Sequence, residues 1–191
     1  TFRPNDGEPF TLIRRYRFVP GEYMFSVETV IENSVDGQQL PLNIKGASYT
    51  LHYGPQIGPS FDELSSGPRG IDYRRFSYAY DDEYEDVQLE QDEYKLLDRQ
   101  VKWAGINGKY FSAVARGHKG RYTRVLFDTR NEPPQGLSAS HSFALTRAAV
   151  SGDSVSDQVL AFAGPKIDEA IGRYDSADDN IWGVYNMHLN E

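Results

Sequence analysis

The sequence predicts an all-β domain with one short helix near its C-terminus. Several segments alternate apolar and polar residues with period two, turn residues separate them at regular intervals, and only one segment has convincing helical spacing. Regularly spaced short strands favour a sandwich over a parallel α/β sheet. The chain has 191 residues, of which 39% are hydrophobic and 13% aromatic, which is enough for one hydrophobic core. We therefore expect residues 1–191 to form a single domain.

The N-terminal segment predicts a hairpin. Strands are expected over Pro9–Phe18 and Glu22–Asn33, with Pro20-Gly21 in the tight turn between them. The second strand alternates, which indicates that one of its faces meets a core. Its inward residues are predicted to be Tyr23, Phe25, Val27, Thr29 and Ile31.

Further strands follow, to give about eight or nine in total by their turn signals. They are expected over Leu40–Tyr53, Ile71–Tyr80, Tyr84–Leu89, Val101–Ala115, Tyr122–Asp128, Leu137–Arg147 and Ser154–Phe162. Between the first two of these lies Gly54–Gly70, which is rich in glycine and proline and has no periodicity. A loop of this length in a compact domain is usually functional or mobile.

One helix is expected over residues 164–174, where it would close the domain. Gly164-Pro165 places a proline at the first helical position, and acidic residues fall in the first turn with Arg173 in the last. The apolar residues recur with the spacing of one helix face. They are Ile167, Ala170, Ile171 and Tyr174.

Composition and motifs argue against several function classes. The net charge of -8 opposes nucleic acid and anionic lipid surfaces, and the absence of cysteine rules out disulfides and thiolate metal sites. The four histidines have no metal-ligand spacing, and the acidic run Asp81–Asp86 lacks the glycine and distal glutamate of a calcium loop. Neither a phosphate-binding loop nor a Gly-x-Ser-x-Gly nucleophile motif is present. We expect no catalytic residue, cofactor, metal or nucleic-acid partner.

Three segments carry a family resemblance, and they occur in a fixed order. Tyr53–Gly58 comes first, then Trp103–Phe111 with its Lys-Tyr-Phe ending, and about fifty residues later Phe162–Lys166 with its Gly-Pro-Lys. Together they resemble the large extracytoplasmic domain of the bacterial YidC membrane-protein insertase. The motif residues are Gly54, Pro55, Trp103, Gly105, Lys109, Tyr110, Phe111, Gly164, Pro165 and Lys166.

The resemblance implies a β-supersandwich related to galactose mutarotase-like domains, of which this chain would be the C-terminal part. It also implies a non-catalytic periplasmic domain of an insertase, which assists insertion and folding of inner-membrane proteins by scaffolding and partner contacts. The implied location is the periplasmic face of the inner membrane, anchored by transmembrane helices outside this chain. The implied partners are translocon components of the SecD and SecF type and the membrane-embedded part of its own chain, with nascent membrane proteins indirectly. The closing helix would contact the membrane-embedded part, and the missing first strands would leave an exposed sheet edge.

The residues themselves leave alternatives open. Trp103, Tyr110 and Phe111 are large aromatics whose simplest role is core packing between two layers. A carbohydrate-binding or mutarotase-like module is the main alternative function, and it requires a histidine and a carboxylate that face each other in a cleft. A self-standing adhesin or lipoprotein module is a third.

Overall fold

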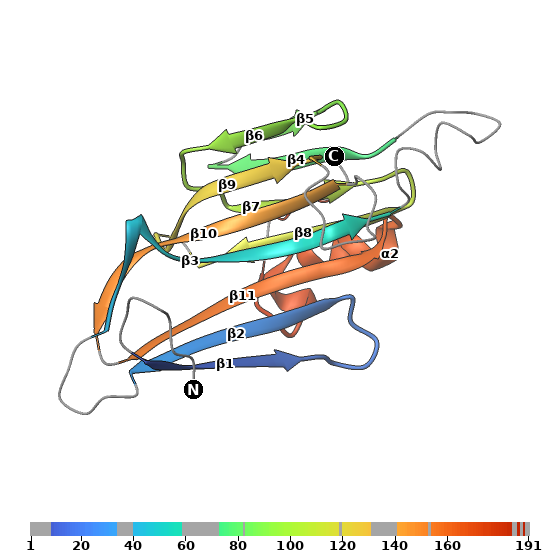
Figure 1. Cartoon of the computed structure of the whole chain (residues 1–191). Helices are drawn as coiled ribbons and strands as arrows, with labels where there is room; N and C mark the ends of the chain where they lie inside the picture. The colour runs from blue at the N-terminus through green and yellow to red at the C-terminus, as the bar shows by residue number, and fades with distance from the viewer. Residues whose placement is uncertain are drawn as a thin grey trace.

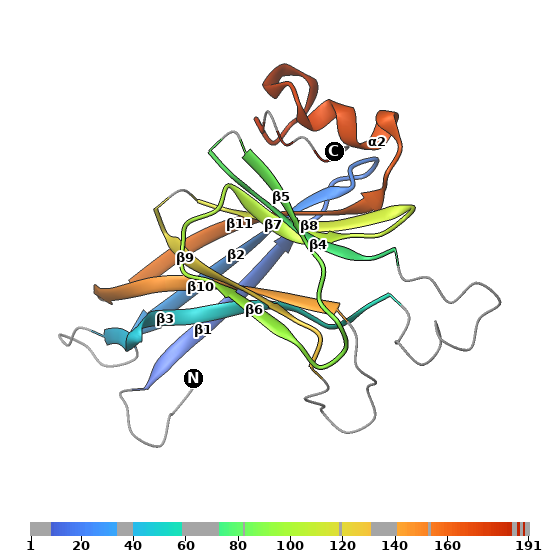
Figure 2. The ribbon, with the colours of Figure 1, turned by 90° about the horizontal axis from the view of Figure 1, so that it is seen from above.

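The protein folds into two antiparallel β-sheets packed face to face, with a short helical region on the outer side of the larger sheet (Figures 1 and 2). The computed structural model describes residues 9–33, 40–58, 73–81, 83–118, 120–130, 141–152, 154–184, 187 and 189. The prediction of an all-β sandwich with one short helix is confirmed.

The larger sheet has seven strands in the order β1-β2-β11-β8-β7-β4-β5. Every neighbouring pair in it is antiparallel. β11 joins the N-terminal hairpin β1–β2 to the remaining strands of the sheet, because it pairs with both β2 and β8. Its strands are β1 (Phe10–Arg17), β2 (Met24–Asn33), β4 (Arg75–Tyr80), β5 (Glu83–Val87), β7 (Trp103–Asn107), β8 (Phe111–Gly117) and β11 (Ser154–Pro165).

The smaller sheet has four strands in the order β3-β10-β9-β6. Its strands are β3 (Leu40–Ile57), β6 (Tyr94–Leu97), β9 (Tyr122–Asp128) and β10 (His141–Gly152). The consecutive strands β10 and β11 therefore belong to different sheets, which ties the two layers together along the chain.

Several predicted strand boundaries are wrong. Residues 101–115 form the hairpin β7–β8 and not one strand, because the Gly108 amide donates to the Phe111 carbonyl at 2.8 Å and closes a turn. Gly54 and Pro55, predicted to begin a loop, belong to β3, which pairs with β10 as far as Ile57. The predicted loop residues 59–70, and residues 137–140 of a predicted strand, lie outside the described residues.

Strand β2 is buried on both faces, which differs from the predicted one-sided pattern. Val27 and Ile31 lie on one face of the strand, and Met24 and Ser26 lie on the other, and all four are buried. The second face is covered because Met24 belongs to a separate apolar cluster with C-terminal residues. Period-two alternation predicts the strand correctly, but cannot reveal that a later segment covers its outer face.

The protein has two hydrophobic clusters, one on each face of the larger sheet. The first lies between the sheets and includes Phe76 and Phe127, whose ring centroids are 4.9 Å apart. The second joins the outer face to the C-terminal segment. Its members are Met24, Ala79, Trp103, Val114, Phe162, Ile171, Tyr174, Val184, Met187 and Leu189. The larger sheet is therefore a shared layer between two cores.

The helical region is shorter than predicted. It consists of α2 (Asp168–Ile171) and two 3-10 turns, η1 (Gly172–Tyr174) and η2 (Ala177–Asp179). Pro165 is the last residue of β11, where it pairs with Phe111, and not the first residue of the helix. A proline suits the end of a strand because it has no amide to donate. Within the described part of the chain, no helix is long and apolar enough to cross a membrane.

Candidate functional site: a groove at one end of the sandwich

The two later motifs of the sequence meet at one end of the sandwich. The β7–β8 turn carries Lys109 and Tyr110, and it lies beside the end of β11, where Gly164 pairs with Ser112. The backbone amide of Lys166 donates to the Tyr110 carbonyl at 2.8 Å, which fixes the turn to the chain after β11. Segments about fifty residues apart are thus joined by backbone hydrogen bonds.

Trp103, Tyr110 and Phe111 were predicted to pack in the core. The prediction is wrong for Tyr110 and Phe111, which lie at this turn and are exposed. Tyr110 is 64% exposed and Phe111 is 66% exposed, whereas Trp103 is only 1% exposed and packs in the outer cluster. Tyr110 lies in the turn itself, and Phe111 is the first residue of β8. Because both residues lie at the end of the hairpin, neighbouring strands cover their side chains only in part, and the side chains reach solvent.

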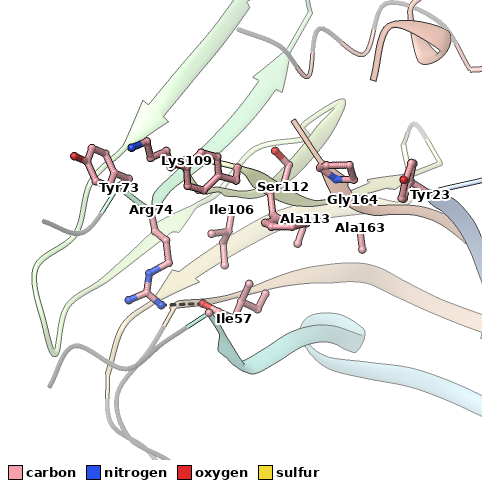
Figure 3. A pocket seen from close by; sticks show the side chains of 15 residues that line it. Tyr23, Ile57, Tyr73, Arg74, Ile106, Lys109, Ser112, Ala113, Ala163 and Gly164 are labelled. Carbon is pink, nitrogen blue, oxygen red and sulfur yellow. Dashed lines mark hydrogen bonds between the residues drawn. The ribbon is translucent and has the colours of Figure 1, made fainter. Parts of the chain in front are cut away.

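A groove of about 830 Å³ opens beside this turn, between the end of β3 and the inner face of the larger sheet. Figure 3 shows Ile106, Ala113 and Ala163 on the larger sheet, with Ile57 across from them on β3. The small alanine side chains leave the space that the groove occupies. The lining residues are Tyr23, Ile57, Gly58, Tyr73, Arg74, Ile106, Gly108, Lys109, Tyr110, Phe111, Ser112, Ala113, Ala163, Gly164 and Pro165.

Two cationic side chains line the groove. Arg74 donates from a guanidinium nitrogen to the Ile57 carbonyl at 2.8 Å, and it is only 8% exposed (Figure 3). The ammonium of Lys109 lies 5.2 Å from the centre of the Tyr73 ring and 5.0 Å from that of Tyr110. A hydrogen bond with Tyr110 raises the pKa of Lys109, so this lysine is charged at neutral pH. The groove therefore combines apolar walls with positive charge.

The groove does not have the chemistry that the mutarotase alternative requires. None of the lining residues that the structure describes is a histidine, an aspartate or a glutamate. Sugar epimerisation by acid–base catalysis needs such groups in the cleft. Across the described residues, histidine, aspartate and glutamate also form no group of three that could hold a metal ion.

Two motif glycines have structural roles, Gly105 outside the groove and Gly164 in its lining. Gly105 is on β7, where an added Cβ would lie 2.3 Å from the Ala113 carbonyl oxygen, so only glycine permits this approach of β7 to β8. Gly164 also excludes a side chain, because its Cβ would lie within 2.8 Å of the Tyr23 ring. Gly54 is remote from the turn motif in the sheet order, since β3 lies in the other sheet.

The predicted contact helix faces inward. Ala170, Ile171 and Tyr174 are 2%, 3% and 0% exposed, whereas Ile167 is 50% exposed. The hydroxyl of Tyr174 donates to Glu22 at 2.8 Å and accepts from the Met24 amide at 3.2 Å. Burial, together with the hydrogen bond to Glu22, raises the pKa of Tyr174 to about 12. Three of the four residues predicted for partner contact therefore anchor the helix to its own sheet.

A second exposed feature is the outer edge of the larger sheet. β1 pairs with β2 only, and it is the outermost described strand on that side. Leu12 and Tyr16 on this strand are 45% and 53% exposed, and Phe18 after it is 68% exposed. Phe18 stacks on Phe25 with ring centroids 4.9 Å apart. Among the described strands, β1 thus has a neighbour on one side only, and it presents apolar side chains.

Sequence reasoning missed half of the groove. Tyr73, Arg74 and Ala113 fell in predicted strands, and Ile57 and Ala163 lay in the segments Tyr53–Gly58 and Phe162–Lys166 without being singled out. A signal was available only for the turn: Asn107-Gly108 followed by two aromatics is typical of a hairpin turn, not of a strand interior. The opposing wall comes from another sheet, and no local pattern encodes it.

Comparison with known proteins assigns the family. A model of the family described as the YidC periplasmic domain matches residues 1–185. The membrane protein insertase YidC of Treponema denticola is 31% identical over 182 residues, which cover 95% of this chain and 30% of that protein. The protein of the same name from Treponema pallidum is 24% identical over 209 residues, which cover 95% of this chain and 33% of that protein. The chain thus spans about a third of the length of these curated relatives, and it belongs to the YidC periplasmic domain family.

Proposed function

We propose that this chain is a non-catalytic periplasmic domain of a YidC-type insertase, which assists insertion and folding of inner-membrane proteins by scaffolding and partner contacts. The domain would lie at the periplasmic face of the inner membrane, anchored by transmembrane helices outside this chain. The family match and the names of its relatives support the proposal. Nascent membrane proteins would be reached indirectly, through the insertase as a whole.

The observation that carries the proposal is the position of β1 at the edge of the larger sheet, as the outermost described strand on that side. The edge of a sheet can accept an extended segment of another protein by strand addition. Natural proteins usually protect such edges against pairing with other chains, but the apolar side chains of Leu12 and Tyr16 are exposed on this strand. Translocon components of the SecD and SecF type are the partners that we propose for this edge.

A second contact is proposed near the C-terminal helical region, with the membrane-embedded part of the insertase. Ile167 precedes α2 and is 50% exposed, and Ile181 after η2 is 57% exposed. The buried residues Ile171 and Tyr174 would hold this surface in a fixed position relative to the larger sheet. Rigid positioning is what a scaffold requires of such a segment.

Photo-cross-linking in the full-length insertase tests the edge proposal. A photoreactive phenylalanine analogue at Tyr16 should yield adducts with SecD- or SecF-type proteins in membranes. The same analogue at Tyr94, which is 58% exposed on β6 of the other sheet, is the matched control and should yield none. Adducts that are absent at Tyr16, or equally abundant at both positions, would contradict the proposed edge contact.

A further inference from the structure

The floor of the groove offers apolar surface with few free backbone groups. β8, which lines it, is paired with both β7 and β11, and at the end of β11 the Ala163 amide donates to the Tyr23 carbonyl at 3.0 Å. A polypeptide lying there would lose water from its amides and carbonyls and gain few hydrogen bonds in return, which is costly. A hydrocarbon chain has no such groups to satisfy. The floor therefore suits an acyl chain better than a peptide.

The charge of the groove lining is opposite to that of the protein as a whole. The chain carries a net charge of -8, yet the described lining residues include Lys109 and Arg74 and no carboxylate. At physiological ionic strength charges are screened over about 8 Å, so a bound headgroup responds mainly to the charges beside it. The groove is therefore more favourable for an anionic group than the net charge of the protein indicates.

The rim has the composition of a membrane–water interface. Tyr23, Tyr73, Tyr110 and Phe111 surround the groove and are 42%, 49%, 64% and 66% exposed. Aromatic side chains of this kind favour the headgroup level of a bilayer, and a lysine among them keeps its charge at the phosphates while its methylenes pack on the rings. Figure 3 shows Lys109 beside Tyr73 at one end of the groove and Tyr23 at the other.

We propose that the groove binds an acyl chain of an anionic phospholipid, with Tyr110 and Phe111 at the bilayer surface and Lys109 at the lipid phosphate. Its volume of about 830 Å³ lies in the range of roughly 300–1,000 Å³ that is usual for small-molecule sites. This inference goes beyond the proposed scaffold function and does not depend on β1, since none of the described lining residues belongs to that strand.

Vesicle co-sedimentation of the 191-residue chain tests the proposal. Binding is measured on vesicles of phosphatidylcholine alone and on vesicles that contain phosphatidylglycerol, at low and high salt. Binding should require phosphatidylglycerol and weaken with salt. Lys109→Gln should weaken it about fivefold, as expected for one lysine near an anionic surface. Phe111→Ser should weaken it about tenfold, because an apolar side chain no longer enters the lipid.

Matched controls come from β6 at the edge of the smaller sheet. Lys95→Gln removes an exposed lysine, and Leu96→Ser removes an apolar side chain that is 54% exposed. Both should leave vesicle binding unchanged, and all four variants should keep the melting temperature because the residues are exposed. Equal losses in the groove variants and their controls would overturn the proposal, as would binding to an apolar peptide in the absence of any binding to vesicles.

A quenching experiment separates an occupied groove from simple charge attraction. Phe111→Trp places a fluorophore at the rim, and phosphatidylglycerol brominated in mid-chain should quench it above the background of the parent chain. The control Tyr94→Trp on β6 should not be quenched. Vesicle binding without quenching at position 111 would show that only headgroups are contacted, and it would overturn the acyl-chain site.

Discussion

Arg147 and Asp157 form an ion pair between the two sheets, with the Nε atom of Arg147 2.8 Å from Oδ2 of Asp157. Arg147 belongs to β10 in the smaller sheet and Asp157 to β11 in the larger sheet. The Asp157 side chain is fully buried, and it also accepts hydrogen bonds from Arg121 at 2.6 Å and from Tyr49 at 2.8 Å. A single carboxylate on the larger sheet therefore links two strands of the smaller sheet, β3 and β10, and Arg121, which immediately precedes β9.

We predict that Asp157→Asn lowers the free energy of unfolding by about 3 kcal/mol, because it leaves the Arg147 guanidinium in a largely buried position without its counter-charge. Urea unfolding measures the change. The matched control is Asp98→Asn, since Asp98 pairs with Arg124 at 2.7 Å but is 76% exposed, and it should change stability by less than about 0.5 kcal/mol. Similar losses in both variants would contradict the role of burial.

Stability should also depend on pH through Asp157. Burial alone would raise the pKa of this carboxyl, but the hydrogen bonds from Arg147, Tyr49 and Arg121 together outweigh it and lower the pKa. A lowered folded-state pKa contributes stability above the unfolded pKa of about 3.9, and that contribution is lost as pH falls through the folded value.

The difference in unfolding free energy between the parent chain and Asp157→Asn should therefore be constant near neutral pH. It should narrow as the pH drops below about 4. Urea unfolding over this pH series checks the prediction. A difference that widens on acidification would contradict it.

Gly105→Ala should destabilise the protein by about 2–3 kcal/mol, because its Cβ would meet the Ala113 carbonyl at 2.3 Å and push β7 from β8. Gly172→Ala is the control. Gly172 has a helical backbone conformation and open space around it, so an alanine there should be neutral or stabilise by up to about 1 kcal/mol. Thermal melting of both variants measures the contrast, and a tolerated Gly105→Ala would show that the strands are not held this closely.

Ile171→Asp and Ile167→Asp should differ sharply, although the sequence pattern places both on one helix face. Ile171 is 3% exposed and Ile167 is 50% exposed. A buried aspartate at position 171 should cost about 3 kcal/mol or more, and the change at position 167 less than about 0.5 kcal/mol. Denaturant unfolding tests this, and equal effects would mean that the helical region docks differently.

The sequence was sufficient for the fold class because alternation and turn residues are local signals. The strands of the N-terminal hairpin and β9 are predicted almost to the residue, since they are rich in β-branched and aromatic residues and turn residues bound them. β6 was missed because Tyr94 and Leu96 are both exposed and only Leu97 is buried, which leaves no alternation to detect. The helix boundary was misplaced because proline suits the end of a strand as well as the start of a helix.

The candidate groove could be predicted only in part. The motif residues Lys109 to Phe111 and Gly164 to Lys166 were identified from their order in the chain, but their proximity depends on the pairing of β8 with β11. Exposure of Tyr110 and Phe111 depends on where the smaller sheet ends. The outer cluster could not be predicted either, because Val184, Met187 and Leu189 pack on the larger sheet from a segment without clear periodicity. These are long-range contacts, which no local pattern determines.

Hydrogen exchange with and without a partner tests the central claim, that β1 is an edge open to strand addition, most directly. In the isolated chain, the amides of residues 12–17 should exchange faster than those of residues 26–32, which are paired with both β1 and β11. On addition of the periplasmic part of a SecD- or SecF-type protein, protection should rise at Phe10–Arg17 and stay unchanged at Tyr94–Leu97. Binding without new protection at Phe10–Arg17 would contradict the account.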